Sequence, residues 1–383
     1  MPRCRVCGEQ KDLIAKAIAV CGDCLRQGST KGRALAIRAH ARPRRELGLP
    51  EVAPRDEATR ACEVCANACQ PSDGQRGLCG AREAKDGRVE PRVGTAREAA
   101  VFWKAFPLPT NCCARWVCPG SSASGYPKYS YSRGPERGHD SLAVGYYGCT
   151  FDCLYCQSCG TRSVEGAPRA SAQQLADAMD KVSCACLFGG DPTPQLAHAL
   201  AAAKIARAKA RREGRKLRIC FETNGAMNRK LLRAMADVSL ESGGCIKVDL
   251  KAFNEDVHQA LCGSSNARTL DNFAYLAGRR RERPEVPLVI ASTPLVPGYV
   301  DVEEVAALAR FIARQGKDIP YLLIGFFSCY HLKDLPNTSL QHARRCLAAA
   351  RAAGLRNVRL DNRELMRDAP EERLSRTRDR AAR

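Results

Sequence analysis

The most regular pattern in this 383-residue chain begins near residue 141, where short apolar runs alternate with longer segments of helical composition. The apolar runs have strand length and span residues 142–147, 185–188, 217–221, 246–250, 288–292 and 321–326. The helical segments span residues 171–181, 194–212, 227–236, 268–280, 302–315 and 340–353. Six β-α repeats predict an α/β fold with a parallel sheet, a partial (β/α)6 TIM-like barrel over residues 141–362. Functional residues of such a fold belong at the C-terminal ends of its strands.

The chain before residue 141 lacks this alternation and is rich in cysteine, which predicts small N-terminal Cys-rich metal-binding modules. We expect a zinc-ribbon-like module over residues 1–30 and a basic, Pro-punctuated linker over 31–60 with one short helix near residues 35–40. A second metal-binding region and a connecting loop rich in Gly, Ser, Pro and Tyr follow over 61–140. Residues 363–383 are predicted to form a charged C-terminal tail.

The chain contains 22 cysteines, and the question is whether they form disulfides or bind metal. The first residues are basic and polar, no apolar run has the length of a signal peptide, and no stretch of 18 apolar residues occurs. Disulfide scaffolds belong to oxidising compartments. We therefore expect a cytoplasmic protein without a membrane segment, whose thiols bind metal.

Two blocks of cysteines precede residue 80, and their spacings differ. Cys4-x2-Cys7 and Cys21-x2-Cys24 have the spacing of a tetrahedral zinc ribbon. Cys62-x2-Cys65-x3-Cys69-x9-Cys79 has four thiols and a glycine-rich return loop, which suits either zinc or an iron-sulfur cluster. A third group, Cys112, Cys113 and Cys118, is too irregular to assign between buried thiols and ligands.

A further set, Cys149-x3-Cys153-x2-Cys156, follows the first predicted barrel strand. Three thiolates in such a loop can hold three irons of a 4Fe-4S cluster and leave the fourth iron open to a substrate. Cys159 lies beyond the tight turn, and we do not expect it to fill the fourth position. The remaining cysteines, from Cys159 to Cys346, are scattered along strands and helices, where small buried thiols need no special role.

The segment CTFDCLYC resembles the CxxxCxxC motif of the radical S-adenosylmethionine (SAM) superfamily, and segments after the later strands match in order. Gly189-Gly190-Asp191-Pro192-Thr193 resembles the family's glycine-rich motif, where backbone without a Cβ can approach a ligand closely. Glu222-Thr223-Asn224-Gly225 and Asp249-Leu250-Lys251 resemble DTNG and DLK of the pyruvate formate-lyase-activating branch, with Glu222 in place of the usual Asp. Leu295-Val296-Pro297-Gly298 is similar to the element that packs on the adenine, and residues 325–336 resemble the exit of the sixth strand.

The resemblance implies cofactors and site residues. Cys149, Cys153 and Cys156 would hold a 4Fe-4S cluster whose unique iron is chelated by SAM. Reductive cleavage of SAM would then give a 5′-deoxyadenosyl radical that abstracts hydrogen from the substrate. The residues expected to bind the cofactor are Tyr155, Gly189, Gly190, Asp191, Glu222, Thr223, Asn224, Asp249, Lys251, Val296 and His331.

Several of these residues also have plain structural interpretations. Gly189 and Gly190 can simply make a turn, and Asp249 and Lys251, on one face of a strand by period-two alternation, can form an ion pair at the barrel rim. Tyr155 can serve only to cover the cluster, and His331 can be an ordinary surface histidine.

Charge and architecture bear on the substrate. The net charge of +20 is scattered along the chain, which favours solvated helix faces over a nucleic-acid surface. A partial barrel has a wide lateral opening, so we expect a macromolecular substrate, a protein or peptide rather than nucleic acid, and an electron donor such as flavodoxin or ferredoxin. Two alternatives stay open: an RNA-binding radical SAM enzyme that modifies RNA, and a non-catalytic metal-binding adaptor with a relic barrel.

Overall fold

A nine-stranded sheet organises the computed structural model, which describes residues 1–110, 112 and 114–366. Its strand order is β11-β10-β9-β8-β7-β6-β4-β3-β5. The seven strands that pair in parallel and in chain order are β4 (Asp140–Tyr146), β6 (Cys184–Gly189), β7 (Arg218–Thr223), β8 (Ile246–Asp249), β9 (Val289–Leu295), β10 (Tyr321–Gly325) and β11 (Val358–Asp361). Because β11 and β5 are the two edges, the sheet is an open, partial barrel and the predicted α/β fold class is confirmed.

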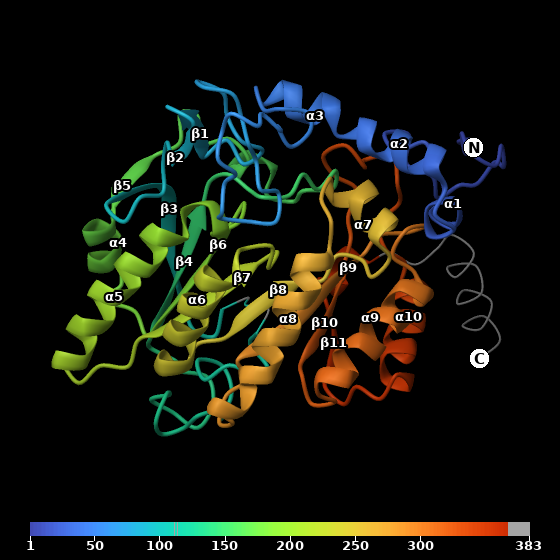
Figure 1. Ribbon diagram of the computed structural model, residues 1–383. Helices are drawn as coiled ribbons and strands as arrows, with labels where there is room; N and C mark the ends of the chain where they lie inside the picture. Colours follow the sequence, from blue (N-terminus) through green and yellow to red (C-terminus); the bar gives the residue numbers. More distant parts are fainter. Residues whose placement is uncertain (111, 113, 367–383) are drawn as a thin grey trace, which may run out of the picture.

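Helices cover the outer face of this sheet, as the prediction of β-α repeats requires (Figure 1). They are α4 (Ala172–Ala178), α5 (Leu196–Arg212), α6 (Arg229–Ser242), α7 (Glu255–Cys262), α8 (Ala267–Arg279), α9 (Val302–Gln315) and α10 (Leu340–Ala352). Short 3-10 turns lie at Cys159–Thr161, Thr193–Gln195, Arg280–Glu282 and Arg363–Leu365. Side chains cap several starts, as Ser171 does in a capping box with Gln174 and Asn228 does for α6.

The sequence pattern missed four elements of the barrel region. The antiparallel strands β3 (Glu98–Pro107) and β5 (Arg169–Ser171) extend the sheet beyond β4, and β11 adds a seventh parallel strand. The eight-residue helix α7, between its cap Asn254 and Gly263, was also unpredicted. Short elements carry little periodicity of their own, so pairing and packing decide them.

The N-terminal region contains α1 (Gly22–Arg26), α2 (Thr30–Ala39), α3 (Ala41–Glu46) and a hairpin of β1 (Arg82–Lys85) with β2 (Arg88–Pro91). Figure 1 shows α2 and α3, in blue, lying across one end of the barrel. Residues 31–60, predicted as a linker with one short helix, therefore hold two helices, and His40 and Arg44 at their junction are buried. The division of the chain into modules stays a prediction.

A long irregular segment, residues 108–139, lies at the end of the barrel opposite α2 and α3 (Figure 1). Glu136 of this segment forms a buried bidentate pair with Arg218 of β7, with N···O distances of 2.9 and 2.7 Å. The segment is thereby anchored to the N-terminal end of the strands. Cys113 and residues 367–383 of the predicted tail lie outside the described residues.

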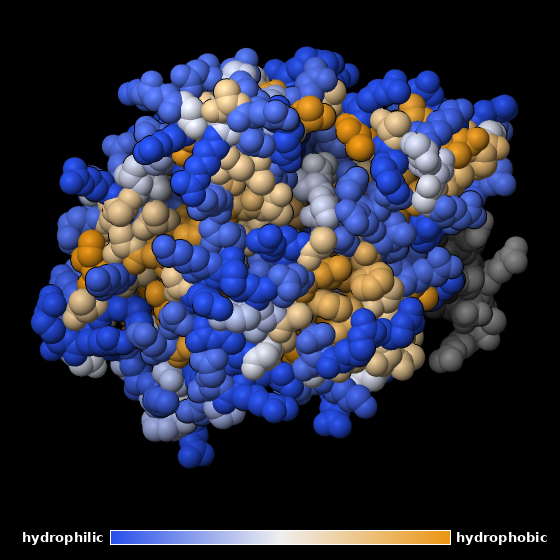
Figure 2. Space-filling view, viewed as in Figure 1, coloured by the Kyte–Doolittle hydropathy of each residue, from blue (hydrophilic) through white to orange (hydrophobic). Residues whose placement is uncertain are grey.

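Every helix within the described ranges is too short or too polar to cross a membrane. On the face shown in Figure 2, hydrophilic residues are spread over most of the surface, with apolar patches between them.

Candidate active site

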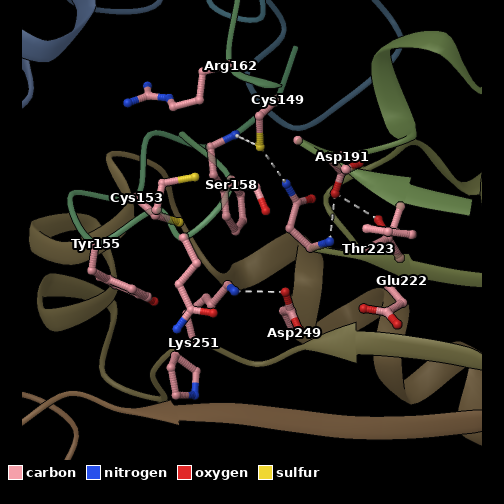
Figure 3. Close-up of a pocket in the computed structure, with 18 of the residues that line it drawn as sticks. Cys149, Cys153, Tyr155, Ser158, Arg162, Asp191, Glu222, Thr223, Asp249 and Lys251 are labelled. Atoms are coloured by element: carbon pink, nitrogen blue, oxygen red, sulfur yellow. Dashed lines mark hydrogen bonds and ion pairs between the residues drawn. The ribbon is translucent and has the colours of Figure 1, made fainter. Parts of the chain in front are cut away.

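A cavity of about 290 Å³ lies where the C-terminal ends of β4, β6, β7 and β8 converge (Figure 3). Most of the residues predicted from the sequence line it together: Cys149, Cys153, Tyr155, Cys156, Gly189, Gly190, Asp191, Glu222, Thr223, Asn224, Asp249 and Lys251. They come from loops far apart in the chain. The parallel topology brings these loops to one rim, as expected for this fold.

The loop with Cys149, Cys153 and Cys156 leaves β4 and is fixed from below by α7. The backbone N–H groups of Asp152 and Leu154 donate to the last carbonyl oxygens of α7, on Cys262 at 2.8 Å and Leu261 at 3.0 Å. These carbonyls would otherwise be unpaired at the helix end. Helix α7, absent from the sequence prediction, is thus what positions the three thiols.

The three thiols lie in the cavity in surroundings that disfavour their thiolate forms. Burial, with the neighbouring Asp191 and Cys153, raises the pKa of Cys149, and burial raises the pKa of Cys156 to about 12. A hydrogen bond with Cys262 is the largest cause that raises the pKa of Cys153, and Lys251 opposes it. Thiolates here need a bound cation, so this donor set fits an iron-sulfur cluster, which is held by cysteine thiolates.

Gly189 and Gly190 bring backbone to the cavity where a side chain would not fit. Gly189 has φ of 111°, and a Cβ there would lie 2.4 Å from the backbone nitrogen of Tyr146. A Cβ on Gly190 would lie 2.4 Å from the carbonyl oxygen of Gly148, in the loop that leads to Cys149. The tight fit against neighbouring backbone explains why glycines stand here.

The carboxylate of Asp191 is used inside the protein. It accepts hydrogen bonds from the N–H groups of Thr193 and Asn224, both at 2.7 Å, and from the hydroxyl of Thr223 at 3.0 Å. Asn224 in turn donates to the hydroxyl of Thr150 at 2.7 Å and lies 3.8 Å from the sulfur of Cys149. Asp191 is therefore a positioning residue, which joins the β6 and β7 loops to the cysteine loop.

Four charged residues form a ladder along one side of the cavity. Lys251 Nζ lies 2.7 Å from Asp249, Lys247 Nζ lies 3.0 Å from Asp249, and Lys247 also lies 2.9 Å from Glu222. Burial would raise the pKa of Asp249, but the two lysines and a hydrogen bond from Ser292 hold it below its usual range. Lys247 is not among the residues predicted from the sequence, although it precedes Asp249 by two residues and so shares its strand face.

Two predicted cofactor residues do not reach the lining of this cavity. Val296 is fully buried in the core behind β9, and Pro294 lines the cavity instead. His331 donates its backbone N–H to Leu154 at 2.9 Å, and its ring lies 3.8 Å from Glu46. Their roles in cofactor binding stay predictions. Lining residues that the sequence did not indicate include Ser158, Arg162, Phe188 and Ile324.

A buried ionic network connects α2 and α3 to the cysteine loop. Asp152 is fully buried, forms an ion pair with Arg162, and lies 2.8 Å from Nδ1 of His40 and 3.5 Å from Arg44. Arg162 also donates to the hydroxyl of Tyr330 at 2.7 Å. The N-terminal helices therefore stabilise the loop from the side opposite the barrel.

The two N-terminal cysteine blocks differ in geometry. The sulfurs of Cys4, Cys7, Cys21 and Cys24 all lie within 4.8 Å of one another, and within the described ranges they are the one set of three or more ligand residues that does so. The second block, Cys62, Cys65, Cys69 and Cys79, lines a small common cavity with Asn67 and Thr150. Asn67 donates to the carbonyl of Thr150 at 2.7 Å, so this block adjoins the Cys149 loop.

Comparison with known proteins supports the interpretation of the cavity. Residues 144–312 match the family model described as the radical SAM superfamily. A protein from Methanocaldococcus jannaschii, named as a candidate glycyl-radical enzyme activating enzyme, is 31% identical over 194 residues, which are 49% of this chain and 68% of the relative.

Two other relatives carry activating-enzyme names. The isethionate sulfite-lyase activating enzyme of Desulfovibrio desulfuricans is 37% identical over 127 residues, 33% of this chain and 36% of that protein. The pyruvate formate-lyase 1-activating enzyme of Escherichia coli is 30% identical over 168 residues, 42% of this chain and 63% of that protein. The chain thus spans between about a third and two thirds of the length of these relatives.

Proposed function

This chain belongs to the radical SAM superfamily, and we propose that it is an enzyme that reductively cleaves SAM at a 4Fe-4S cluster to a 5′-deoxyadenosyl radical, which abstracts hydrogen from a protein substrate. The observation that carries the proposal is the convergence of three thiols, a glycine backbone and a ladder of two carboxylates and two lysines on one cavity. Structural ion pairs alone do not account for a hollow beside three thiols with raised pKa values.

Each part of the cavity has a task in this proposal. Cys149, Cys153 and Cys156 would hold the cluster, and Gly189 and Gly190 would offer backbone to SAM. Glu222 and Asp249 would accept hydrogen bonds from the cofactor, and Lys251 would donate to it, next to Cys153. Tyr155, fully buried against Phe326 with a centroid distance of 6.1 Å, would close the cavity against water. These roles are positioning and exclusion of solvent rather than acid-base work.

A protein substrate is supported by the relatives, whose names describe activating enzymes of lyases. The charged side chains give an RNA substrate little support, because many arginines pair with carboxylates within the chain, such as Arg279 with Asp237 and Glu282 and Arg92 with Glu83 and Glu165. An external electron donor of the flavodoxin or ferredoxin type completes the proposal.

We assign zinc to the first cysteine block. A Zn–S bond of about 2.3 Å places the sulfurs of a tetrahedral site about 3.8 Å apart, and Cys4 and Cys24 sulfurs lie at 3.9 Å. Burial would raise the pKa of Cys4, but N–H groups of Cys21, Cys7 and Val6 lower it to about 6 and favour a thiolate ligand. The second block suits zinc or an iron-sulfur cluster.

The test of the enzymatic proposal is anaerobic. Protein loaded with iron and sulfide is mixed with SAM and dithionite, and 5′-deoxyadenosine is measured by chromatography. Wild type should form it, and Cys149→Ala, Cys153→Ala and Cys156→Ala should not. Cys159→Ala, which removes an exposed thiol of the same loop, is the matched control and should retain activity. Loaded wild type that forms no 5′-deoxyadenosine would overturn the proposal.

The substrate class is tested with deuterated extracts. Protein and RNA fractions are prepared from bacteria grown in heavy water and added separately to the loaded enzyme. Deuterium in 5′-deoxyadenosine from the protein fraction supports a protein substrate, because the hydrogen abstracted comes from the substrate. Deuterium from the RNA fraction alone would contradict it.

A further inference from the structure

Six cysteines outside the cavity converge at the opposite end of the barrel: Cys112, Cys118, Cys184, Cys186, Cys220 and Cys245, here called the barrel-floor cysteines. Four of them lie on or beside strands, where the sequence indicated scattered thiols without a role. The other two belong to the segment 108–139. The six cysteines outnumber the four ligands of a single tetrahedral metal ion. None of them has a role in the function proposed above.

The strand register places three of these thiols side by side. Cys186 of β6 and Cys220 of β7 are paired residues, and Cys245 directly precedes β8 beside them. The backbone N–H of Cys245 donates to the sulfur of Cys220 at 3.4 Å. Cys184 lies two residues before Cys186 on the same strand face.

The same strand faces line the cavity above. The cavity is lined by one residue from each of these strands: Phe188, two residues after Cys186; Glu222, two residues after Cys220; and Lys247, two residues after Cys245. Alternation therefore points these thiols into the barrel, about 7 Å below the cavity residues along the strands. The thiol of Cys186 donates to Glu222 at 3.6 Å and links the two levels.

Three of these thiols are partly accessible, whereas Cys245 is buried. Cys184, Cys186 and Cys220 are only half-buried, whereas Ala185, Leu187 and Phe221, which point to the helices, are buried. Sulfurs that merely filled a core would be packed on all sides.

The segment 108–139 brings two more thiols to this end of the barrel. Cys118 is close enough to Cys112, Cys245 and Cys184 for their charges to interact, and Cys112 has the same relation to Cys186 and Cys220. Cys112 and Cys118 also pack against the apolar group that contains Cys245. Thiols from three strands and one loop thus face one another.

The buried guanidinium of Arg283 lies beside them. Arg283 is 3% exposed, and within the described ranges its hydrogen bonds all go to backbone carbonyl oxygens, such as those of Ser239 and Gly244. Its Nε has no partner there. Its charge acts on Cys245 and Cys220. Among the described residues Arg283 forms no ion pair within 4.0 Å, although Glu285 and the ring of Tyr129 also act on it, so a negative group at the thiols would add a buried counter-charge.

We propose that the barrel floor binds an iron-sulfur cluster through thiolates of the barrel-floor cysteines. Thiolate-only donor sets select zinc, Cu(I) or iron-sulfur clusters. A tetrahedral zinc ion needs sulfurs about 3.8 Å apart, and in the described part of the chain only the Cys4 set approaches this spacing. A cluster accepts sulfurs that are further apart, and its negative charge faces Arg283 and Arg218.

The test uses a full-length chain in which Cys149, Cys153 and Cys156 are already alanine, so its result is independent of SAM cleavage. Into this chain Cys184→Ala, Cys220→Ala and Cys245→Ala are introduced together. After anaerobic loading with iron and sulfide, the second chain should contain about two to four fewer iron atoms than the first, with the matching loss of sulfide. A matched control carries Cys159→Ala, Cys329→Ala and Cys346→Ala and should keep its iron.

A second measurement covers the case in which the variants do not fold, as judged by near-UV circular dichroism. The loaded parent chain and the same chain stripped by a chelator are treated with methyl methanethiosulfonate, and modified cysteines are identified by peptide mass spectrometry. Cys184, Cys220 and Cys245 should be protected only in the loaded protein. Equal labelling in both states, unchanged iron in the folded variant, or zinc in place of iron would each overturn the proposal.

Discussion

Lys251 donates a hydrogen bond to Asp249 at 2.7 Å, inside the same cavity that the three cysteines of the CTFDCLYC segment line. Asp249 is the last residue of β8, and Lys251 lies two residues beyond the end of this strand, at the rim of the barrel. Lys247 approaches the other oxygen of Asp249 at 3.0 Å, so this one carboxylate balances two ammonium groups. An ion pair with this placement holds hydrogen-bonding groups in fixed positions around a ligand site.

Replacement of Asp249 by Asn should therefore impair both stability and the proposed cleavage. It leaves Lys251 without its carboxylate in a mostly enclosed site, and we expect a loss of about 1 to 3 kcal/mol in the free energy of unfolding. The rate of 5′-deoxyadenosine formation should fall at least tenfold. Denaturant melts and the anaerobic assay measure the two effects.

The control for this change is Asp237→Asn, which breaks an exposed pair with Arg279. Surface pairs contribute about 0 to 1 kcal/mol, so stability should change little and activity should be retained. Equal effects of the two substitutions would contradict a special role for Asp249.

Gly190→Ala should distort the cavity, because it forces apart backbone segments that pack beside it. The new Cβ would meet the carbonyl oxygen of Gly148 at 2.4 Å, and backbone rather than a flexible side chain would have to move. Affinity for SAM should fall tenfold or more, which corresponds to at least about 1.4 kcal/mol, as measured by equilibrium dialysis of loaded protein. Gly160→Ala, in the same region with open space around its Cβ position, should bind SAM like wild type.

The buried imidazole of His258 predicts a pH dependence of stability. Its Nδ1 donates to the carbonyl of Ser264 at 2.7 Å, and burial, with Lys251 nearby, lowers its pKa to about 4. In the unfolded chain the pKa returns to about 6.5, so between pH 6.5 and 4 only the unfolded state binds the proton. Above pH 6.5 the titration of His258 does not reduce the free energy of unfolding. As the pH falls below 6.5, that free energy decreases, by an amount on the order of 3 kcal/mol at pH 4.

The measurement compares wild type with His258→Asn, whose amide can donate the same hydrogen bond. The difference in free energy of unfolding between the two, followed from pH 7.5 to 4.5 in denaturant, should shift in favour of the variant as the pH falls. Parallel pH curves for the two proteins would show that His258 is not held neutral.

The Tyr299 side chain connects the barrel to the first cysteine block through two hydrogen bonds. Its hydroxyl donates to the carbonyl of Val20 at 2.9 Å and accepts from the N–H of Ala15 at 3.1 Å, and all three residues are fully buried. Tyr299→Phe leaves two buried backbone groups unpaired, at a cost of about 1 to 3 kcal/mol each. Trypsin should then cleave within residues 1–40 of zinc-loaded protein several times faster, whereas Tyr126→Phe, at an exposed position, should not change cleavage.

The sequence by itself determined the parts of this protein that depend on local pattern. Alternating apolar and helical segments predicted the six strands β4, β6, β7, β8, β9 and β10, because buried parallel strands are short and apolar. The spacing of Cys149, Cys153 and Cys156, with glycines and charged residues after successive strands, predicted the cavity that the structure shows. Such signals lie within a few residues of one another, or repeat once per strand.

Only the tertiary structure decided which distant residues meet. Helix α7 is too short to give a clear helical pattern in the sequence, yet its last carbonyl oxygens accept hydrogen bonds from the cysteine loop. Val296 and His331 sit in matching motifs but lie away from the cavity lining, because chain direction after a strand depends on packing. Cys186, Cys220 and Cys245 are 34 and 25 residues apart along the chain, and the register of β6, β7 and β8 places them side by side. Spacing in the sequence records local geometry, whereas convergence across strands is a property of the folded sheet.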